Sequence, residues 1–192
     1  MKPLTAFLLS LISIFPCCAD KNIPKLPLTT IRYTYGSQMI AYPEYSVTFM
    51  TREDSVLAIV FDIDKIQYSL YRITQPDVMK KMKDIIIKEK MYKYKSSYSN
   101  PHVLDGDGWS FYAGFKDDVD DRHQHYESIS SGGSNKWPKG DGLKLIREAM
   151  NDALSSAEFL RLCDENGNEI TKDPNEEIEN TEAENENQDE QD

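Results

Sequence analysis

Twice along the chain, a region whose hydrophobic residues alternate as in β-strands is followed by a region whose hydrophobic residues recur as in an α-helix. Few folds are compatible with this order. Period-two alternation covers 31–73 and again 109–131, whereas a period of about 3.6 residues covers 77–91 and 141–156. Runs of strands that are each followed by a helix favour a sheet covered by helices on one side. We therefore predict an α+β fold, a two-layer sandwich in which two helices pack on one face of an antiparallel sheet.

The second of these regions predicts a β-hairpin that leads into a helix. Its first strand places four apolar side chains on one face, namely Trp109, Phe111, Ala113 and Phe115. The return strand covers 126–131, and the acidic stretch 116–125 between the strands has no apolar period. A glycine-rich turn then follows at 132–135. We expect Trp109 to be buried in the core.

The first region predicts a meander of four strands and then a helix. The strands cover 31–35, 45–49, 56–63 and 66–73. The helix has its apolar positions at Val78, Met79, Met82, Ile85, Ile86 and Met91, and the later helix has them at Leu143, Ile146, Ala149, Met150, Ala153 and Leu154. Each set falls on one side of a helix, as expected of helices that cover a sheet. Asp141 is placed to cap the second helix.

Residues 1–19 predict an export signal. A lysine precedes an apolar run over 4–15, which has the length of a signal-peptide hydrophobic region and is shorter than the roughly 20 residues of a spanning helix. Two routes of processing stay open, cleavage before Asp20 or acylation of Cys18 or Cys17 as in a lipoprotein. On either route we expect an exported protein in the periplasm, on the outer membrane surface or outside the cell.

Composition divides the rest of the chain into three parts. Residues 20–27 contain two prolines and predict a short tether, 28–170 predicts a single α+β domain, and 171–192 predicts a disordered acidic tail. The tail holds ten Asp or Glu residues and one lysine, whereas 20–170 holds 20 basic and 23 acidic residues. The formal net charge of −11 therefore belongs mostly to the tail. Without a basic stripe, we expect no nucleic acid as a partner.

No residue pattern predicts catalysis. Cys163 is the only cysteine outside the signal, so the domain has no internal disulfide, and we expect this thiol in a buried strand. The serines of 130–134 have no nucleophile-elbow motif around them. The sequence Asp-Gly-Asp-Gly at 105–108 resembles the start of a calcium loop but lacks the later ligands.

One stretch of the chain could bind a metal ion. The candidate ligands lie within 117–125 and are Asp118, Asp120, Asp121, His123 and His125. Carboxylates suit hard cations and imidazole suits zinc or nickel. The two histidines would point the same way in an extended strand. A metal-dependent hydrolase that uses a divalent ion is therefore the alternative function. The other interpretation of an acidic hairpin tip is a solvated loop without a ligand, and in that case we expect no cofactor.

Aromatic side chains outside the strands are candidates for binding. The strand tyrosines Tyr33, Tyr35, Tyr45, Tyr68 and Tyr71 are interpreted as ordinary strand residues. Tyr94 and Tyr98 fall in the aperiodic segment 93–107, and Trp137 falls in the turn 132–140. We expect these three side chains to be exposed and to bind a partner, because Tyr and Trp join a large contact area to a polar tip. For Trp137 the alternative is a cap over the apolar end of the following helix.

Residues of the second region, together with the signal, resemble those of a group of exported bacterial proteins. The pattern W-x-F-x-x-x-F at 109–115, the run Ile-Ser-Ser-Gly-Gly-Ser-Asn-Lys-Trp-Pro at 129–138 and the cysteine pair in the signal resemble small exported proteins, in part lipoproteins, of Bacteroidetes-type bacteria. The resemblance covers roughly 105–155 and implies a location in the cell envelope. It carries over no catalytic residue, because that group has no assigned activity.

These observations together predict a non-enzymatic module of the cell envelope or the secreted fraction. We expect it to bind a protein or glycan partner through the segment 93–107 and the turn 132–140. We expect contact with a membrane only through a lipid anchor. The metal-dependent hydrolase built on 117–125 remains the alternative.

Overall fold

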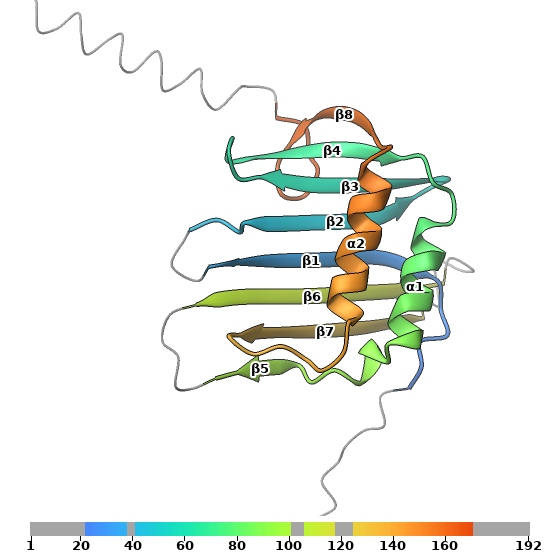
Figure 1. The fold of residues 1–192 in the computed structure, drawn as a ribbon. Helices are drawn as coiled ribbons and strands as arrows, with labels where there is room; N and C mark the ends of the chain where they lie inside the picture. Colours follow the sequence, from blue (N-terminus) through green and yellow to red (C-terminus); the bar gives the residue numbers. More distant parts are fainter. Residues whose placement is uncertain (1–21, 38–40, 101–105, 118–124, 171–192) are drawn as a thin grey trace, which may run out of the picture.

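The computed structural model describes residues 22–37, 41–100, 106–117 and 125–170. These residues form one eight-stranded sheet with two α-helices on one of its faces, a mixed α+β fold in which strands dominate (Figure 1). The elements in chain order are β1 (Leu28–Ser37), β2 (Tyr45–Arg52), β3 (Ser55–Asp62), β4 (Gln67–Ile73), α1 (Val78–Lys88), the 3-10 helix η1 (Met91–Lys93), β5 (Ser97–Ser99), β6 (Asp107–Lys116), β7 (Tyr126–Ser134), α2 (Gly142–Leu154) and β8 (Glu158–Cys163).

The predicted meander and the predicted hairpin are both present. The strands from β1 to β4 pair antiparallel in chain order, and Phe49 of β2 lies opposite Ile31 on one side and Ala58 on the other. β6 and β7 form the antiparallel hairpin. The hairpin does not extend the meander at β4, because β6 pairs with β1 at the other side. The resulting strand order is β5-β7-β6-β1-β2-β3-β4-β8.

The sheet is mixed, so the prediction of a purely antiparallel sheet is wrong at one edge. β5 runs parallel to β7, with Ser97 opposite Gly132 and Ser99 opposite Ser134. This strand comes from the segment 93–107, which the sequence predicts as an aperiodic loop. Three residues are too few for an alternating pattern to appear in the sequence. The strand also depends on a partner much later in the chain.

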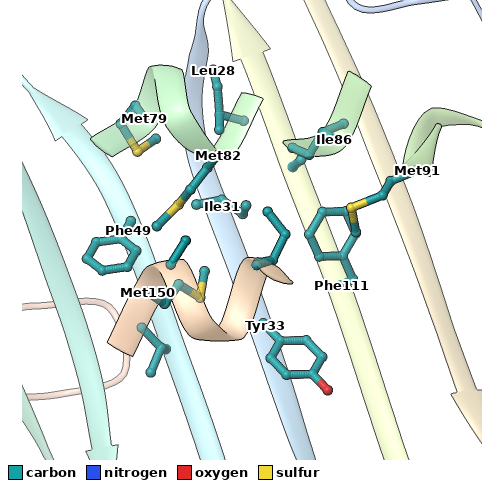
Figure 2. Packing of buried hydrophobic residues seen from close by; sticks show 14 of the residues in the cluster. Leu28, Ile31, Tyr33, Phe49, Met79, Met82, Ile86, Met91, Phe111 and Met150 are labelled. Carbon is teal, nitrogen blue, oxygen red and sulfur yellow. The ribbon is translucent and has the colours of Figure 1, made fainter. Parts of the chain in front are cut away.

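Both helices cross the strands and bury one apolar side against the sheet (Figure 1). Figure 2 shows Met82 of α1 and Met150 of α2 packed with Ile31 and Phe49 of the sheet. All four side chains are fully buried, and each such burial contributes about 1.5–3 kcal/mol. Asp141 is the N-cap residue of α2, as predicted, although its side chain makes no capping hydrogen bond.

Trp109 lies in this core, as the alternation of β6 predicts. Its side chain is 4 % exposed, and it shares the helix-covered face with Phe111 and Phe115. Trp109 also lies opposite Tyr35 of β1. Because paired residues point to the same face of a sheet, Tyr35 faces the helices as well.

The opposite face of the sheet carries a smaller apolar cluster near the end of the domain. Ile59, Leu70 and Cys163 are buried there, so the thiol is buried as predicted, although its strand β8 is an edge strand whose other residues are exposed or half-buried. A turn follows β8, in which the N–H of Asp164 donates to the carbonyl of Asn168 at 2.9 Å. The Asp164 carboxylate accepts hydrogen bonds from the side-chain amide and the N–H of Asn168, which hold the pKa of Asp164 below its usual value.

The described part of the predicted tether contacts the domain. The N–H of Lys25 donates to Oε2 of Glu127 at 2.9 Å, and Nζ of Lys83 donates to the carbonyl of Lys25 at 3.1 Å. Pro24 is buried. Packing of the domain therefore begins before β1. The predicted signal and the predicted acidic tail lie outside the described residues.

Candidate binding groove

Tyr94 does not take the exposed position that the sequence predicts. Its side chain is only 6 % exposed and belongs to the core, so this expectation is wrong. The residue follows η1 and lies close to Gly142 of α2, where an added Cβ would stand 2.6 Å from Oη of Tyr94. Burial raises the pKa of Tyr94 to about 12. The ring of Tyr94 is therefore not accessible to a partner.

Tyr98 is half-buried and packs β5 onto the sheet. Its ring centroid lies 6.4 Å from that of Tyr94 and 5.7 Å from that of Trp109. The N–H of Lys95 donates to the Tyr98 hydroxyl at 3.2 Å. These contacts explain Tyr98 as part of the sheet edge.

Trp137 is the predicted binding residue that remains exposed, with 42 % of its side chain accessible. Its ring stacks on Trp109, with centroids 5.4 Å apart and an interplanar angle of 17°. Its centroid also lies 5.8 Å from that of Tyr35. The ring is exposed as expected and also covers part of the core, and its binding role stays a prediction. The residue that it covers is Trp109 rather than the end of α2.

The backbone around Trp137 is held by hydrogen bonds to the start of β6. The indole Nε1–H of Trp109 donates to the carbonyl of Lys136 at 2.8 Å. The N–H of Asp107 donates to Oδ1 of Asn135 at 3.1 Å, and the N–H of Asn135 donates to the carbonyl of Asp107 at 2.9 Å. Gly133 allows this approach, since a Cβ there would lie 2.6 Å from Nε1 of Trp109. The fold therefore presents Trp137 in a defined place.

A groove of about 290 Å³ opens beside Trp137, between β1 and α2. It is lined by Tyr33, Tyr35, Trp137, Pro138, Gly140, Leu143, Lys144 and Arg147. β1 supplies the tyrosines of the sheet face, the turn after β7 supplies Trp137, and α2 supplies the two cations. We call this hollow the Trp137 groove.

The charged residues that line the Trp137 groove are both basic. Lys144 lies 4.0 Å from Glu148 in an exposed pair, which contributes little. Arg147 forms no ion pair within the part of the chain that the structure describes. Burial raises the pKa of Tyr45 to about 12 and raises that of Tyr33, while the positive charge of Arg147 acts to lower both values. The guanidinium therefore lies near the phenols of the sheet face.

The aromatic floor continues past Arg147 along α2. The ring centroids of Tyr33 and Tyr45 lie 5.8 Å apart, and the Tyr45 hydroxyl donates to Oδ1 of Asn151 at 2.9 Å. Beyond Tyr45 a second hollow of about 470 Å³ has a different character. Its charged lining residues are the acidic Glu44 and Asp62 and the basic Lys65. The two hollows thus differ in charge, and the basic one contains Trp137.

The predicted metal loop lies mostly outside the described residues. Asp118, Asp120, Asp121 and His123 are not described, and His125, which is described, is exposed. The described residues contain no group of three His, Cys, Asp or Glu side chains that could hold a metal ion. The metal-dependent hydrolase stays a prediction.

A nucleophilic role for Cys163 finds no support in its surroundings. The side chain is fully buried, and burial raises the pKa of the thiol to about 11. A thiol with a raised pKa supplies little thiolate at neutral pH, and thiolate is the reactive form.

Sequence reasoning missed the residues that surround Trp137. Tyr33 and Tyr35 are strand residues as predicted, yet they also form the floor of the groove. Arg147 falls on the polar side of the second helical period and therefore resembles any solvated cation. The signal in the sequence that points to this role is the i, i+2 spacing of Tyr33 and Tyr35, which places both side chains on the same face of one strand. Their neighbours become known only once the sheet order is known.

Comparisons of the chain with protein-family models, curated proteins and solved structures find no match. Among the described residues, no helix combines the length and the apolar character needed to cross a membrane.

Proposed function

We propose that the protein is an exported, non-catalytic module that binds a glycan through the Trp137 groove. The observation that carries the proposal is an exposed indole ring that is fixed in place beside two tyrosines and an arginine. Aromatic rings provide flat apolar faces on which the C–H face of a sugar ring can stack, and the phenol and guanidinium groups offer hydrogen bonds to sugar hydroxyls. The proposal places the site at Trp137, in the turn that follows β7, rather than in the segment 93–107, where Tyr94 is buried and Tyr98 packs on the sheet edge.

A small ligand fits this face better than a protein partner. The groove volume, about 290 Å³, is close to the lower end of pockets that bind small molecules, roughly 300–1,000 Å³. A stable protein interface needs about 800 Å² on each partner, with a connected apolar centre. On this face the exposed large apolar side chains include Trp137 and Phe159, which lie in different hollows. A glycan is therefore the partner that we propose.

Rigidity supports the same proposal. Ordering mobile side chains on binding costs about 0.5–1.5 kcal/mol for each one. Trp137 avoids most of this cost, because the stack on Trp109 and the hydrogen bond from Trp109 to Lys136 fix its position before a ligand arrives. A groove with a prearranged ring can bind a small sugar with useful affinity.

The binding proposal is tested with the purified protein and a panel of neutral and acidic oligosaccharides, followed by tryptophan fluorescence and calorimetry. We expect a member of the panel to bind, and Trp137→Ala to weaken its affinity by about tenfold or more. Phe159→Ala is the matched control, since Phe159 is 53 % exposed and lies outside the groove. No binding across the panel, or an equal loss in the control, contradicts the proposal.

Export is proposed on the predicted signal at 1–19 and is tested separately. Intact mass spectrometry of the protein from its natural host gives the first residue of the mature chain. A chain that begins at Asp20 indicates ordinary cleavage, and a lipid mass on Cys18 or Cys17 indicates an anchored lipoprotein. A chain that keeps Met1 contradicts export.

A further inference from the structure

We propose that the saccharide bound in the Trp137 groove is acidic, and that Arg147 binds its carboxylate. This inference rests on the proposed glycan-binding function and narrows it to one class of ligand. It is carried by the charges of the groove, the position of Arg147 and the polar groups at the Tyr35 end.

The charge of the groove is opposite to that of the chain. Residues 20–170 hold 20 basic and 23 acidic residues, and most of the formal net charge of −11 lies in 171–192, yet both charged residues that line the groove, Lys144 and Arg147, are basic. No acidic side chain appears in the lining. A basic hollow on an acidic protein attracts an anionic ligand and disfavours a neutral one of the same shape.

Arg147 is placed to meet a ligand rather than to stabilise α2. Its side chain is exposed and pairs with no carboxylate among the described residues, unlike Lys81, which pairs with Asp152 at 3.0 Å. Arg147 lines the groove together with Tyr33 and Tyr35 of β1, so its charge lies beside the aromatic floor. A guanidinium presents a planar fork of N–H donors that matches the two oxygens of a carboxylate.

The groove can bind both the pyranose ring and the carboxylate of an acidic sugar. In a uronic acid the carboxylate projects from the rim of the pyranose ring, so the ring can stack on Trp137 while the carboxylate reaches α2. At the other end, the Tyr35 hydroxyl donates to Oδ2 of Asp107 at 2.8 Å. Tyr35 lines the groove, and its hydroxyl oxygen, whose proton is donated to Asp107, can accept a hydrogen bond from a sugar hydroxyl.

An acidic peptide fits the groove less well than an acidic saccharide. Extended peptides commonly bind by adding a strand to an open sheet edge, where backbone groups supply the hydrogen bonds. β1, which forms the floor of the groove, is an inner strand paired with both β2 and β6. Rings and side chains line the groove, and they suit sugar rings and hydroxyls.

Calorimetry with matched probes tests the inference. The probes are trigalacturonate, its neutral methyl ester and a short glutamate peptide. We expect the protein to bind trigalacturonate about tenfold or more tightly than the ester, since a hydrogen bond to a charged group is stronger than one to a neutral group. We also expect the affinity for trigalacturonate to fall as the salt concentration is raised, and the affinity for the ester to stay unchanged, because salt screens charge interactions.

Variants at Arg147 assign the effect to one side chain. We expect Arg147→Gln to lower the affinity for trigalacturonate by about tenfold or more and to leave the affinity for the ester unchanged. Arg147→Lys should lower the affinity for trigalacturonate by an intermediate factor. Arg52→Gln is the control, because it removes one positive charge from the exposed end of β2, away from the groove. Glutamine keeps the helix propensity of arginine, so α2 should stay folded.

The outcomes separate the two proposals. The inference is overturned if the ester binds as tightly as the acid, if Arg147→Gln matches the Arg52→Gln control, or if the glutamate peptide binds more tightly than trigalacturonate. If neutral sugars bind and only Trp137→Ala lowers their affinity, the glycan-binding function is supported and the preference for acidic sugars is contradicted. If no saccharide binds, both proposals fall.

Discussion

The indole ring of Trp137 belongs both to the fold and to the groove. It stacks on the buried Trp109, whose indole N–H holds the backbone carbonyl next to Trp137. Less than half of the Trp137 side chain is accessible, so the ring has one packed part and one open part. A change at Trp137 should therefore affect stability moderately and binding strongly.

The two tryptophans should differ in what they contribute to stability. Trp109→Ala should lower the free energy of unfolding by about 3–5 kcal/mol, because it empties a large site in the core. Trp137→Ala should lower it by about 1–2 kcal/mol, since an aromatic stack is worth about 0.5–1.5 kcal/mol beyond the area it buries. Urea unfolding of each variant measures both values. Equal losses would contradict the division of roles.

Tyr45 should make the fold sensitive to alkaline pH. Burial raises the pKa of Tyr45 from the usual 10.0 of a tyrosine to about 12, so the unfolded chain loses this proton at lower pH than the folded chain. The stabilising effect is complete below about pH 10 and is lost as the pH rises towards 12. Thermal melts from pH 9 to 12 should therefore fall less steeply for Tyr45→Phe than for the wild type. Parallel curves would show that Tyr45 titrates as an exposed tyrosine.

At the scale of elements, close backbone approaches fix how α2 and β5 meet the sheet. Gly142, the first residue of α2, lies against Tyr94 and Met91, and an added Cβ would stand 2.6 Å from Oη of Tyr94 and 2.9 Å from Cγ of Met91. Gly133 of β7 allows a similar approach to Trp109 and Lys136. The sequence predicts a turn at 132–135, but Gly132, Gly133 and Ser134 lie in β7 and pair with β6, so the prediction is wrong for these three residues. The missing side chain at Gly133 serves a close approach between elements rather than a turn.

Gly142→Ala tests this contact. Replacing glycine by alanine within a helix usually stabilises it by about 0.4–1 kcal/mol. Here we expect a loss of about 1–3 kcal/mol, because the new methyl group overpacks a buried site. Adding Tyr94→Phe removes the nearest atom and should recover part of the loss, which a double-mutant cycle would measure. A stabilised Gly142→Ala variant would show that the contact is looser than described.

The elements that the sequence predicts well are those whose evidence is local. The hairpin of β6 and β7, the meander from β1 to β4 and both helices each appear as a run with a fixed period. β5 was not predictable, because its three residues pair in parallel with a strand that forms much later in the chain. The exposure expected for Tyr94 failed for the same reason, since its burial depends on α2.

At the scale of the whole molecule, the groove results from the sheet order. The hairpin joins the meander at β1, which brings Tyr35 opposite Trp109 and places the turn with Trp137 above both residues. α2 then crosses the same face and supplies Arg147 (Figure 1). The sequence alone predicts Trp137 as a candidate, but it contains no local signal for the strand order that adds the tyrosines and the arginine.

Mapping of chemical shifts by NMR tests the central claim, that the Trp137 groove is the binding site, most directly. The chain has two tryptophans and therefore two indole N–H signals, which can be followed while trigalacturonate is added. We predict that the indole signal of Trp137 and the backbone amides of Leu143 and Arg147 shift together, while the amides of His125 and Tyr126 stay in place. Shifts confined to residues outside the groove, with the Trp137 indole unmoved, would contradict the account.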